Sequence, residues 1–292
     1  MHRRRSGVPR EDSCKVSRRR VLGGFAALSG GAMIGRASAS AVGLGRSLFD
    51  AHIHYNGEIA AVLKPAEAVA RLRTAGIARA IVSSTPDDLT LDLLAAAPDL
   101  VVPFLRPYRT HGDRDGWLVN GDVLAEIERR LDRAPYTGIG EFHINPLAPP
   151  GSILPRIVHL ARERRLWILA HVAARVIDQI YALDPEARII WAHAGGLVEP
   201  AETVAAYVAR YPGLHLELSL RSGLTVGERV SETWLAILGM ARGRVMLGTD
   251  TWTNSRWDEV EGEANFARRW LSGLPSDMAD DIAIGTGRRL FG

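Results

Sequence analysis

The stretch "LFDAHIHYNG", residues 48–57, decides how the rest of the chain is read. An apolar run leads into His52 and His54, two imidazoles separated by one residue. Side chains alternate between the two faces of a β-strand, so residues two apart point the same way. If this run is a strand, both imidazoles face one side of it and form a two-pronged clamp.

Seven further apolar or β-branched runs follow, and longer stretches with helical character separate them. Eight strands with crossover helices, over about 240 residues, predict a single parallel (β/α)8 barrel, the TIM-barrel fold. A doubly wound open sheet is the competing architecture. No G-x-G-x-x-G follows any run, which weakens a dinucleotide-binding fold. The seven runs are 78–84, 100–108, 136–144, 166–172, 188–196, 214–220 and 244–250.

Helices are expected between the runs and after the last one. The tail, residues 261–292, is expected to form two helices that are broken at Gly273 and Pro275 and that close the barrel. No repeat or linker divides the chain after its leader, so residues 42–292 are expected to form one domain. The expected crossover helices include 65–75, 122–134, 152–165, 200–211 and 228–241.

Residues 1–41 have the composition of an export signal. They hold nine Arg or Lys and two Asp or Glu, a net charge of +7, so the remainder carries −4 of the total of +3. The basic residues 18–20 precede a mildly apolar, Gly-rich stretch that ends in small-x-small cleavage motifs at Ala39 and Ala41. This arrangement resembles a twin-arginine leader, with Arg18 and Arg19 as the pair. A disordered basic tail or an uncleaved anchor is the alternative.

The leader predicts an exported protein, periplasmic or extracellular, whose partners are the twin-arginine export machinery and a small-molecule substrate. Arg36 interrupts the apolar stretch, which argues against a stable membrane anchor. The negative charge of residues 42–292 gives no basis for binding nucleic acid. The single cysteine, Cys14, lies in the leader, so the mature chain has neither disulfides nor thiolate chemistry.

Five of the eight predicted strands end in side chains that bind metal ions. In a (β/α)8 barrel the carboxyl ends of all strands meet at one face. One such residue at a strand end is usually an ordinary polar group, but this many imidazoles and carboxylates in one place predict a metal site, because their burial is costly unless they are paired or metal-bound. They are His52 and His54, then Glu141 with His143, His171, His193 and Asp250.

The expected metal is zinc, because the ligands are imidazoles and carboxylates without thiolates, although manganese, iron and cobalt suit the same set. These segments also resemble the amidohydrolase superfamily, and in particular its amidohydrolase-related metal-dependent hydrolases with TIM-barrel folds. The resemblance covers residues 48–292. It is carried by "DAHIHY" (50–55), "GIGEFH" (138–143), "AHV" (170–172), "WAHAGG" (191–196) and "LGTD" (247–250).

The resemblance implies that His52 and His54 bind metal and that His171 and Asp250 are further ligand positions. It implies for His193 a place as a ligand of a second metal or as a proton donor. The tail departs from the family pattern, since Thr286 and Gly287 stand where Asn-Ala is usual. That departure concerns packing of the tail rather than chemistry.

The resemblance also bears on the number of ions, one or two. Binuclear members bridge their ions with a carboxylated lysine or with a glutamate from strand three or four. Lys64, the only lysine after the leader, lies before the first helix, so a lysine bridge is excluded. Glu141 stands where a glutamate bridge would come from, which favours two ions. The alternative is that Glu141 only hydrogen-bonds a ligand histidine.

Four other residues are weaker candidates for contacts with the substrate. Arg106 and Tyr108 end the third predicted strand, where an arginine suits a carboxylate or phosphate. The alternative for Arg106 is a solvated arginine in a loop. Ser219 ends the seventh predicted strand, on the same face as Glu217, and fills the barrel interior in the alternative reading. Trp252 follows Asp250 and would form an apolar wall.

These observations predict a metal-dependent hydrolase of a small amide, lactone or ester. A metal-activated water attacks, Asp250 takes its proton as general base, and His193 orients or protonates. One alternative is a metal-dependent decarboxylase of a small carboxylic acid, which uses one ion. The other is an exported metal-containing protein that binds a ligand without catalysis.

Export can be tested with the double variant Arg18→Lys and Arg19→Lys. We expect the precursor to stay in the cytoplasm, because the twin-arginine pathway requires the arginine pair. Immunoblots of cell fractions report the result. A mature form that still appears outside the cytoplasm in the variant would contradict the twin-arginine assignment.

Overall fold

The computed structural model describes residues 45–144, 151, 153–196 and 198–292, so the leader and its cleavage motifs lie outside the described residues. Eight parallel strands follow each other in the order β1-β2-β3-β4-β5-β6-β7-β10. Their bounds are β1 Leu48–Ile53, β2 Ile77–Val82, β3 Val101–Leu105, β4 Gly138–His143, β5 Trp167–His171, β6 Ile189–Trp191, β7 Leu214–Glu217 and β10 Val245–Met246.

The two ends of this sheet meet, which closes the barrel. The backbone N–H of Ala51 donates to the carbonyl of Leu247 at 2.8 Å, and that of His54 to Thr251 at 2.9 Å. The buried Asp50 carboxylate joins the same two segments, because it accepts hydrogen bonds from the backbone of His52 and from Thr249. The prediction of a (β/α)8 barrel is confirmed, and the open doubly wound sheet is wrong.

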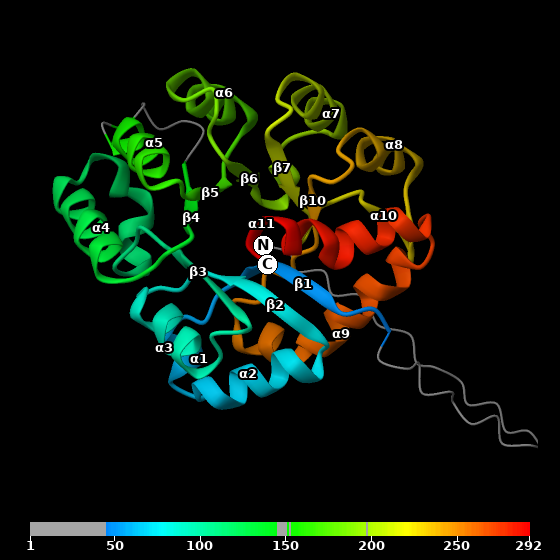
Figure 1. Cartoon of the computed structure of the whole chain (residues 1–292), viewed down its shortest axis with the longest axis horizontal. Helices are drawn as coiled ribbons and strands as arrows, with labels where there is room; N and C mark the ends of the chain where they lie inside the picture. The colour runs from blue at the N-terminus through cyan, green and yellow to red at the C-terminus, as the bar shows by residue number, and fades with distance from the viewer. Residues whose placement is uncertain (1–44, 145–150, 152, 197) are drawn as a thin grey trace, which may run out of the picture. The chain divides into compact units, whose positions relative to one another are not determined.

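Helices surround the strands on the outside of the barrel (Figure 1). Amphipathic spacing explains their packing: α4 buries Val123, Ile127 and Leu131, each four residues from the next. Among the described residues, no helix has both the length and the hydropathy to cross a bilayer. The helices are α1 Gly57–Ala60, α2 Pro65–Thr74, α3 Asp88–Ala96, α4 Gly121–Arg133, α5 Ile153–Arg164, α6 Ala174–Leu183, α7 Ala201–Arg210, α8 Glu232–Met240 and α9 Asn254–Leu271.

The helix expected over 228–241 begins later than predicted. Two short strands, β8 Thr225–Val226 and β9 Arg229–Val230, form a hairpin that takes up its first residues. Gly227 at the turn has a φ of 61°, a conformation that glycine adopts without cost. Helix α8 then starts after Ser231, whose side chain caps it by accepting from the backbone of Trp234.

The tail closes the amino-terminal end of the barrel, as predicted. After the break that follows α9, helix α10 (Ser276–Asp280) continues through a π-helical turn, η4 (Asp281–Gly285), into α11 (Thr286–Phe291). Helix α11 lies at the centre of the barrel in Figure 1. Its Phe291 ring contacts the rings of Phe49, Phe104 and Trp167 with centroids 5.5–6.0 Å apart. This end of the barrel is therefore apolar and filled.

Gly287 has a packing reason to be glycine. A Cβ built on it would lie 2.2 Å from the ring of Phe49. The Gly287 that stands in place of the usual alanine therefore makes room for this ring.

We predict that Gly287→Ala lowers the free energy of unfolding by about 1–3 kcal/mol, because the added methyl group overpacks the plug. Gly262→Ala is the matched control, since nothing lies within 4 Å of its Cβ position in α9. Alanine should stabilise that helix slightly. Thermal unfolding of both variants measures the difference, and equal melting temperatures would contradict this account of the tail.

Candidate metal centre

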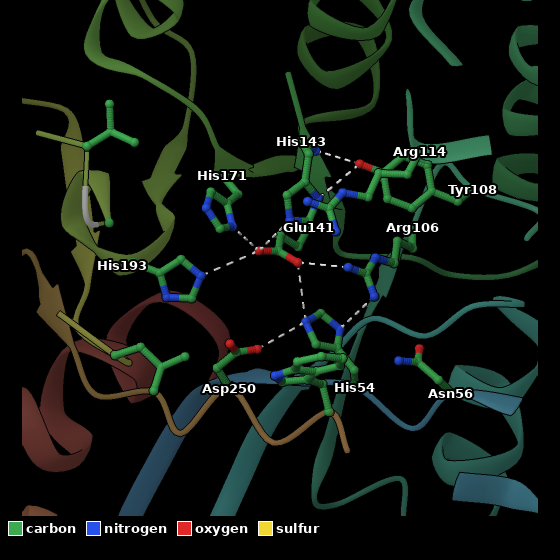
Figure 2. Close-up of a pocket in the computed structure, with 14 residues that line it drawn as sticks. His54, Asn56, Arg106, Tyr108, Arg114, Glu141, His143, His171, His193 and Asp250 are labelled. Atoms are coloured by element: carbon green, nitrogen blue, oxygen red, sulfur yellow. Dashed lines mark hydrogen bonds and ion pairs between the residues drawn. The ribbon is translucent and has the colours of Figure 1, made fainter. Parts of the chain in front are cut away.

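The carboxyl end of the barrel holds a cavity of about 610 Å³. His54, Glu141, His171, His193 and Asp250, predicted from five strand ends, all line it (Figure 2). His52 lies directly beneath it, fully buried, with its Nε2 3.0 Å from the Nε2 of His54. The structure thus brings together all six residues that the sequence nominated as metal ligands.

Three of the imidazoles share one hydrogen-bonding pattern. Each places its Nδ1 against an oxygen outside the centre: a Glu217 carboxylate oxygen 2.8 Å from His52, the carbonyl of Ser83 beside His54, and the carbonyl of Ser219 2.9 Å from His193. With Nδ1 donating a proton to these oxygens, each Nε2 keeps its lone pair. A histidine that binds metal is held in this way by a second hydrogen bond.

The two oxygens of Glu141 face different partners. Oε2 lies 3.3 Å from the Nε2 of His54 and accepts a hydrogen bond from Arg106 at 2.8 Å. Oε1 lies 2.8 Å from Nδ1 of His171, 3.5 Å from Nε2 of His52 and 3.6 Å from Nε2 of His193. The carboxylate therefore stands between two groups of imidazoles, His52 with His54 and His171 with His193; Figure 2 shows it between His54 on one side and His171 and His193 on the other.

Asp250 approaches the first of these groups. Its Oδ1 lies 3.6 Å from Nε2 of His52 and 3.5 Å from Nε2 of His54. Burial raises the pKa of Asp250, but the neighbouring His52 and His54 imidazoles lower it more, so it lies well below its usual range. Asp250 is thus a carboxylate at neutral pH.

Glu217 is the residue of this centre to which sequence reasoning assigned no role. It is fully buried at the end of β7 and accepts hydrogen bonds from the ring of His52, the backbone of His193 and the hydroxyl of Ser219. Gly248 makes room for it, because a Cβ there would lie 2.1 Å from its Oε1. The signal was a carboxylate at the end of the alternating run "LHLEL", residues 214–218, on the face opposite the three leucines.

Ser219 is not among the residues that line this cavity, so a substrate contact by Ser219 stays a prediction. Its side chain is 3% exposed, and its Oγ lies 2.9 Å from both Glu217 Oε2 and His193 Nδ1. Strand β7 ends at Glu217, and the Ser219 side chain that follows it is buried against Glu217 and His193. Ser219 therefore belongs to the network that holds His193 in place.

Arg106 and Tyr108 line the cavity, but one terminal nitrogen of Arg106 and the Tyr108 hydroxyl are already engaged. The Arg106 side chain is buried against Glu141, and the Tyr108 hydroxyl hydrogen-bonds the backbone and ring of His143. Burial lowers the pKa of His143 to about 3, so this ring is neutral at physiological pH. Trp252 also lines the cavity, with 43% of its surface exposed, as expected for a wall.

The turn that carries His193 is held by a buried arginine. His193 and Ala194 have φ values of 55° and 45°, a left-handed conformation that is costly for residues with side chains. Arg221 donates hydrogen bonds to the carbonyls of Ala194, Gly196 and Glu199, so it fixes this turn from outside. This turn directs Nε2 of His193 toward Glu141.

The charges at this centre are unbalanced. Glu141, Glu217 and Asp250 are 3%, 0% and 8% exposed, and Arg106 is the guanidinium that contacts them among the described residues. Burial lowers the pKa of His52, but the carboxylates around the ring raise this pKa by more, so the pKa of His52 lies well above its ordinary value. The buried carboxylates are thus stabilised by a positive charge next to this ring.

The donor set therefore fits divalent metal. Three groups of side chains bring potential ligand atoms within 4.8 Å of one another, and Glu141 belongs to two of them. These groups are His52, His54 and Glu141; His52, His193 and Glu217; and Glu141, His143 and His171. Imidazole nitrogens with carboxylate oxygens suit zinc and related metals.

No family model matches the sequence, and no curated protein matches it. Solved structures do share its fold. A putative 2-pyrone-4,6-dicarboxylic acid hydrolase from Pseudomonas putida matches with a TM-score of 0.54 and 18% identity, over 84% of this chain and 97% of the other. A probable hydrolase of the same description from Acinetobacter baumannii, with citric acid bound, matches with a TM-score of 0.54 and 10% identity, over 84% and 99%.

An adenosine deaminase from Xanthomonas campestris, with bound zinc, matches with a TM-score of 0.51 and 15% identity, over 85% of this chain and 67% of the other. At these identities the likeness shows the fold alone. The barrel that the sequence predicted, and that its resemblance to the amidohydrolase superfamily implied, is the fold of this chain.

Proposed function

We propose that this chain is a metal-dependent hydrolase of the amidohydrolase superfamily that acts on an amide, lactone or ester of a small molecule. The observation that carries the proposal is the centre itself. Buried Glu141, Glu217 and Asp250 surround imidazole nitrogens that face inward, with Arg106 as the one guanidinium in contact among the described residues. Such a set is costly to bury without a bound cation.

Two ions, most simply zinc, fit the division of contacts around Glu141. His52, His54, Asp250 and Glu141 would hold one, and Glu141, His171 and His193 would hold the other. His143 is a further donor near the second group. When bound, such ions lower the pKa of water toward neutrality and polarise the substrate carbonyl.

The chain's own residues supply proton transfer and orientation. The ionised Asp250 accepts the proton of the attacking water and passes it to the leaving group. His193, held at Nδ1 by Ser219, presents Nε2 to the cavity and orients the reacting group. Arg106 keeps the Glu141 carboxylate in position through its 2.8 Å hydrogen bond.

The other two functions remain distinguishable. Decarboxylation by a single ion calls for a cationic partner for the acid, and the Arg106 guanidinium is engaged with Glu141. A ligand-binding protein without catalysis needs no proton acceptor, whereas Asp250 stands in the cavity as one. The leader extends the proposal to export, with hydrolysis taking place outside the cytoplasm.

We predict two divalent ions per purified chain and fewer than two in Glu141→Gln, because an amide cannot bridge two cations as a carboxylate does. Elemental analysis of both proteins is the measurement. Glu217→Gln is the matched control. It removes a carboxylate that lies outside the bridge, so we expect two ions at saturation with affinity about 10–100-fold weaker. A ratio near one ion in both the wild type and Glu141→Gln would contradict the bridge and favour the decarboxylase.

We predict that Asp250→Asn keeps most of its metal but loses turnover by about 100-fold or more, the scale of losing acid–base catalysis. His52→Ala should lose metal and activity together, because half of the His52–His54 clamp is gone. Metal content and turnover on a panel of lactones, esters and acylated amino acids separate the two effects. Near wild-type turnover in metal-loaded Asp250→Asn would disprove its role as general base.

A further inference from the structure

The cavity has two chemically different sides, and the barrel order places them opposite each other. Arg114 lies in η1 (His111–Asp115), which follows β3, whereas Leu220 follows β7. In the eight-membered strand order, β3 and β7 are half a turn of the barrel apart. Glu141 and Asp250 line the space between the two sides. A ligand that touches both sides therefore passes over the proposed reaction centre.

The first side offers a cation that the proposed mechanism does not use. Arg114 lines the cavity on the side of Tyr108 and His143, as Figure 2 shows. Its neighbour Arg109 pairs with Asp113 at 3.0 Å, but Arg114 has no carboxylate partner among the side chains that the structure describes. Arg106 is held by Glu141. Arg114 is thus available to an anionic group, for which the planar guanidinium offers paired donors.

The opposite side is apolar and open. Val198, Leu220 and Trp252 line it with 68%, 54% and 43% of their surfaces exposed. The backbone of Leu220 has a φ of 51°, a left-handed conformation that costs free energy in a residue with a side chain. Exposed apolar side chains gathered in a concave site are the surface that an apolar ligand group covers.

We propose that the substrate is an acylated amino acid whose acyl group is apolar. Its carboxylate binds Arg114, its acyl chain lies against Leu220 and Trp252, and its amide carbonyl lies between them, near Glu141 and Asp250. The cavity of about 610 Å³ accommodates a molecule of this size. This inference rests on the proposed hydrolase function and specifies its substrate class.

The reaction is a simple hydrolysis. The amide C–N bond breaks, the acyl carbon takes the hydroxyl of water, and the amine nitrogen takes the proton. The products are an apolar carboxylic acid and a free amino acid. In this arrangement the substrate carboxylate is anchored at Arg114, on one wall of the cavity, rather than at the reacting centre, so the carboxylate is not the group that reacts.

Binding of a ligand that cannot be hydrolysed tests the inference directly. The probe is the ketomethylene analogue of N-(phenylpropanoyl)glycine, in which a methylene group replaces the amide NH. Its neutral partner is the same molecule with a carboxamide in place of the carboxylate. Calorimetry on the metal-loaded full-length protein should show that the acid binds about tenfold or more tightly than the amide, the scale of charge-assisted hydrogen bonds.

The variants locate the source of this preference. Arg114→Gln should abolish it, and Arg114→Lys should restore part of it. Arg109→Gln is the matched control, because it breaks the pair with Asp113 in the same loop and should leave the preference intact. Trp252→Ala should weaken both ligands equally. The assignment is overturned if the wild type does not prefer the acid, if it binds neither ligand, or if the preference survives in Arg114→Gln.

Hydrolysis of N-(phenylpropanoyl)glycine is assayed separately, so that the two proposals fail in different ways. The expected binding pattern without hydrolysis would contradict the hydrolase and leave the ligand class in place. Hydrolysis of esters or lactones without the expected binding pattern would contradict the ligand class and leave the hydrolase in place. Hydrolysis that is faster for the phenylpropanoyl than for the acetyl derivative, with this advantage reduced in Trp252→Ala, supports both.

Discussion

The structure depends on the burial of negative charge at one end of a closed barrel. Glu141, Glu217 and Asp250 come from different strands and are almost fully shielded from water. Each would lose far more hydration free energy than it regains unless cations or hydrogen-bond donors replace the water. The arrangement of the imidazoles, of Arg106 and of the loops after the strands follows from that requirement.

The two ends of the barrel differ in their packing and polarity. At the amino-terminal end, Phe291 and the rings around it fill the interior with apolar side chains, so the end contributes to stability and leaves no room for a ligand. At the carboxyl end, polar residues and an open cavity replace this packing. A polar end is tolerated because the apolar plug and the helices around the strands supply the hydrophobic burial that holds the barrel closed.

Orientation within the polar end is set by residues that do not themselves face the cavity. Glu217 holds His52 and, together with Ser219, the turn of His193. Arg221 supports the same turn through backbone carbonyls. Because the rings of His52, His54 and His193 are fixed at Nδ1, their Nε2 atoms converge without having to be drawn together by a ligand. A centre preorganised in this way loses little entropy when it binds metal or substrate.

The sequence by itself determined the strand order, the closing role of the tail and the set of strand-end residues that gather at one face. Those features are local: apolar runs of strand length, alternation along each run, and the rule that parallel strands share one carboxyl end. The two imidazoles of "LFDAHIHYNG" share a face for that reason alone. The late start of α8 was missed because a two-residue turn at Gly227 leaves little trace in hydrophobic periodicity.

Only the tertiary structure decided which polar side chains act on one another. Glu217 and His52 are 165 residues apart, yet Oε2 of Glu217 lies 2.8 Å from Nδ1 of His52. The two side chains meet because β1 and β7 lie on either side of β10 in the closed barrel. For the same reason the sequence could nominate Arg106 for a substrate but not show that Glu141 engages it, or that Arg114 lines the same cavity. Pairing between distant strand ends depends on register and side-chain direction, and these are set by the closure of the barrel rather than by any local pattern.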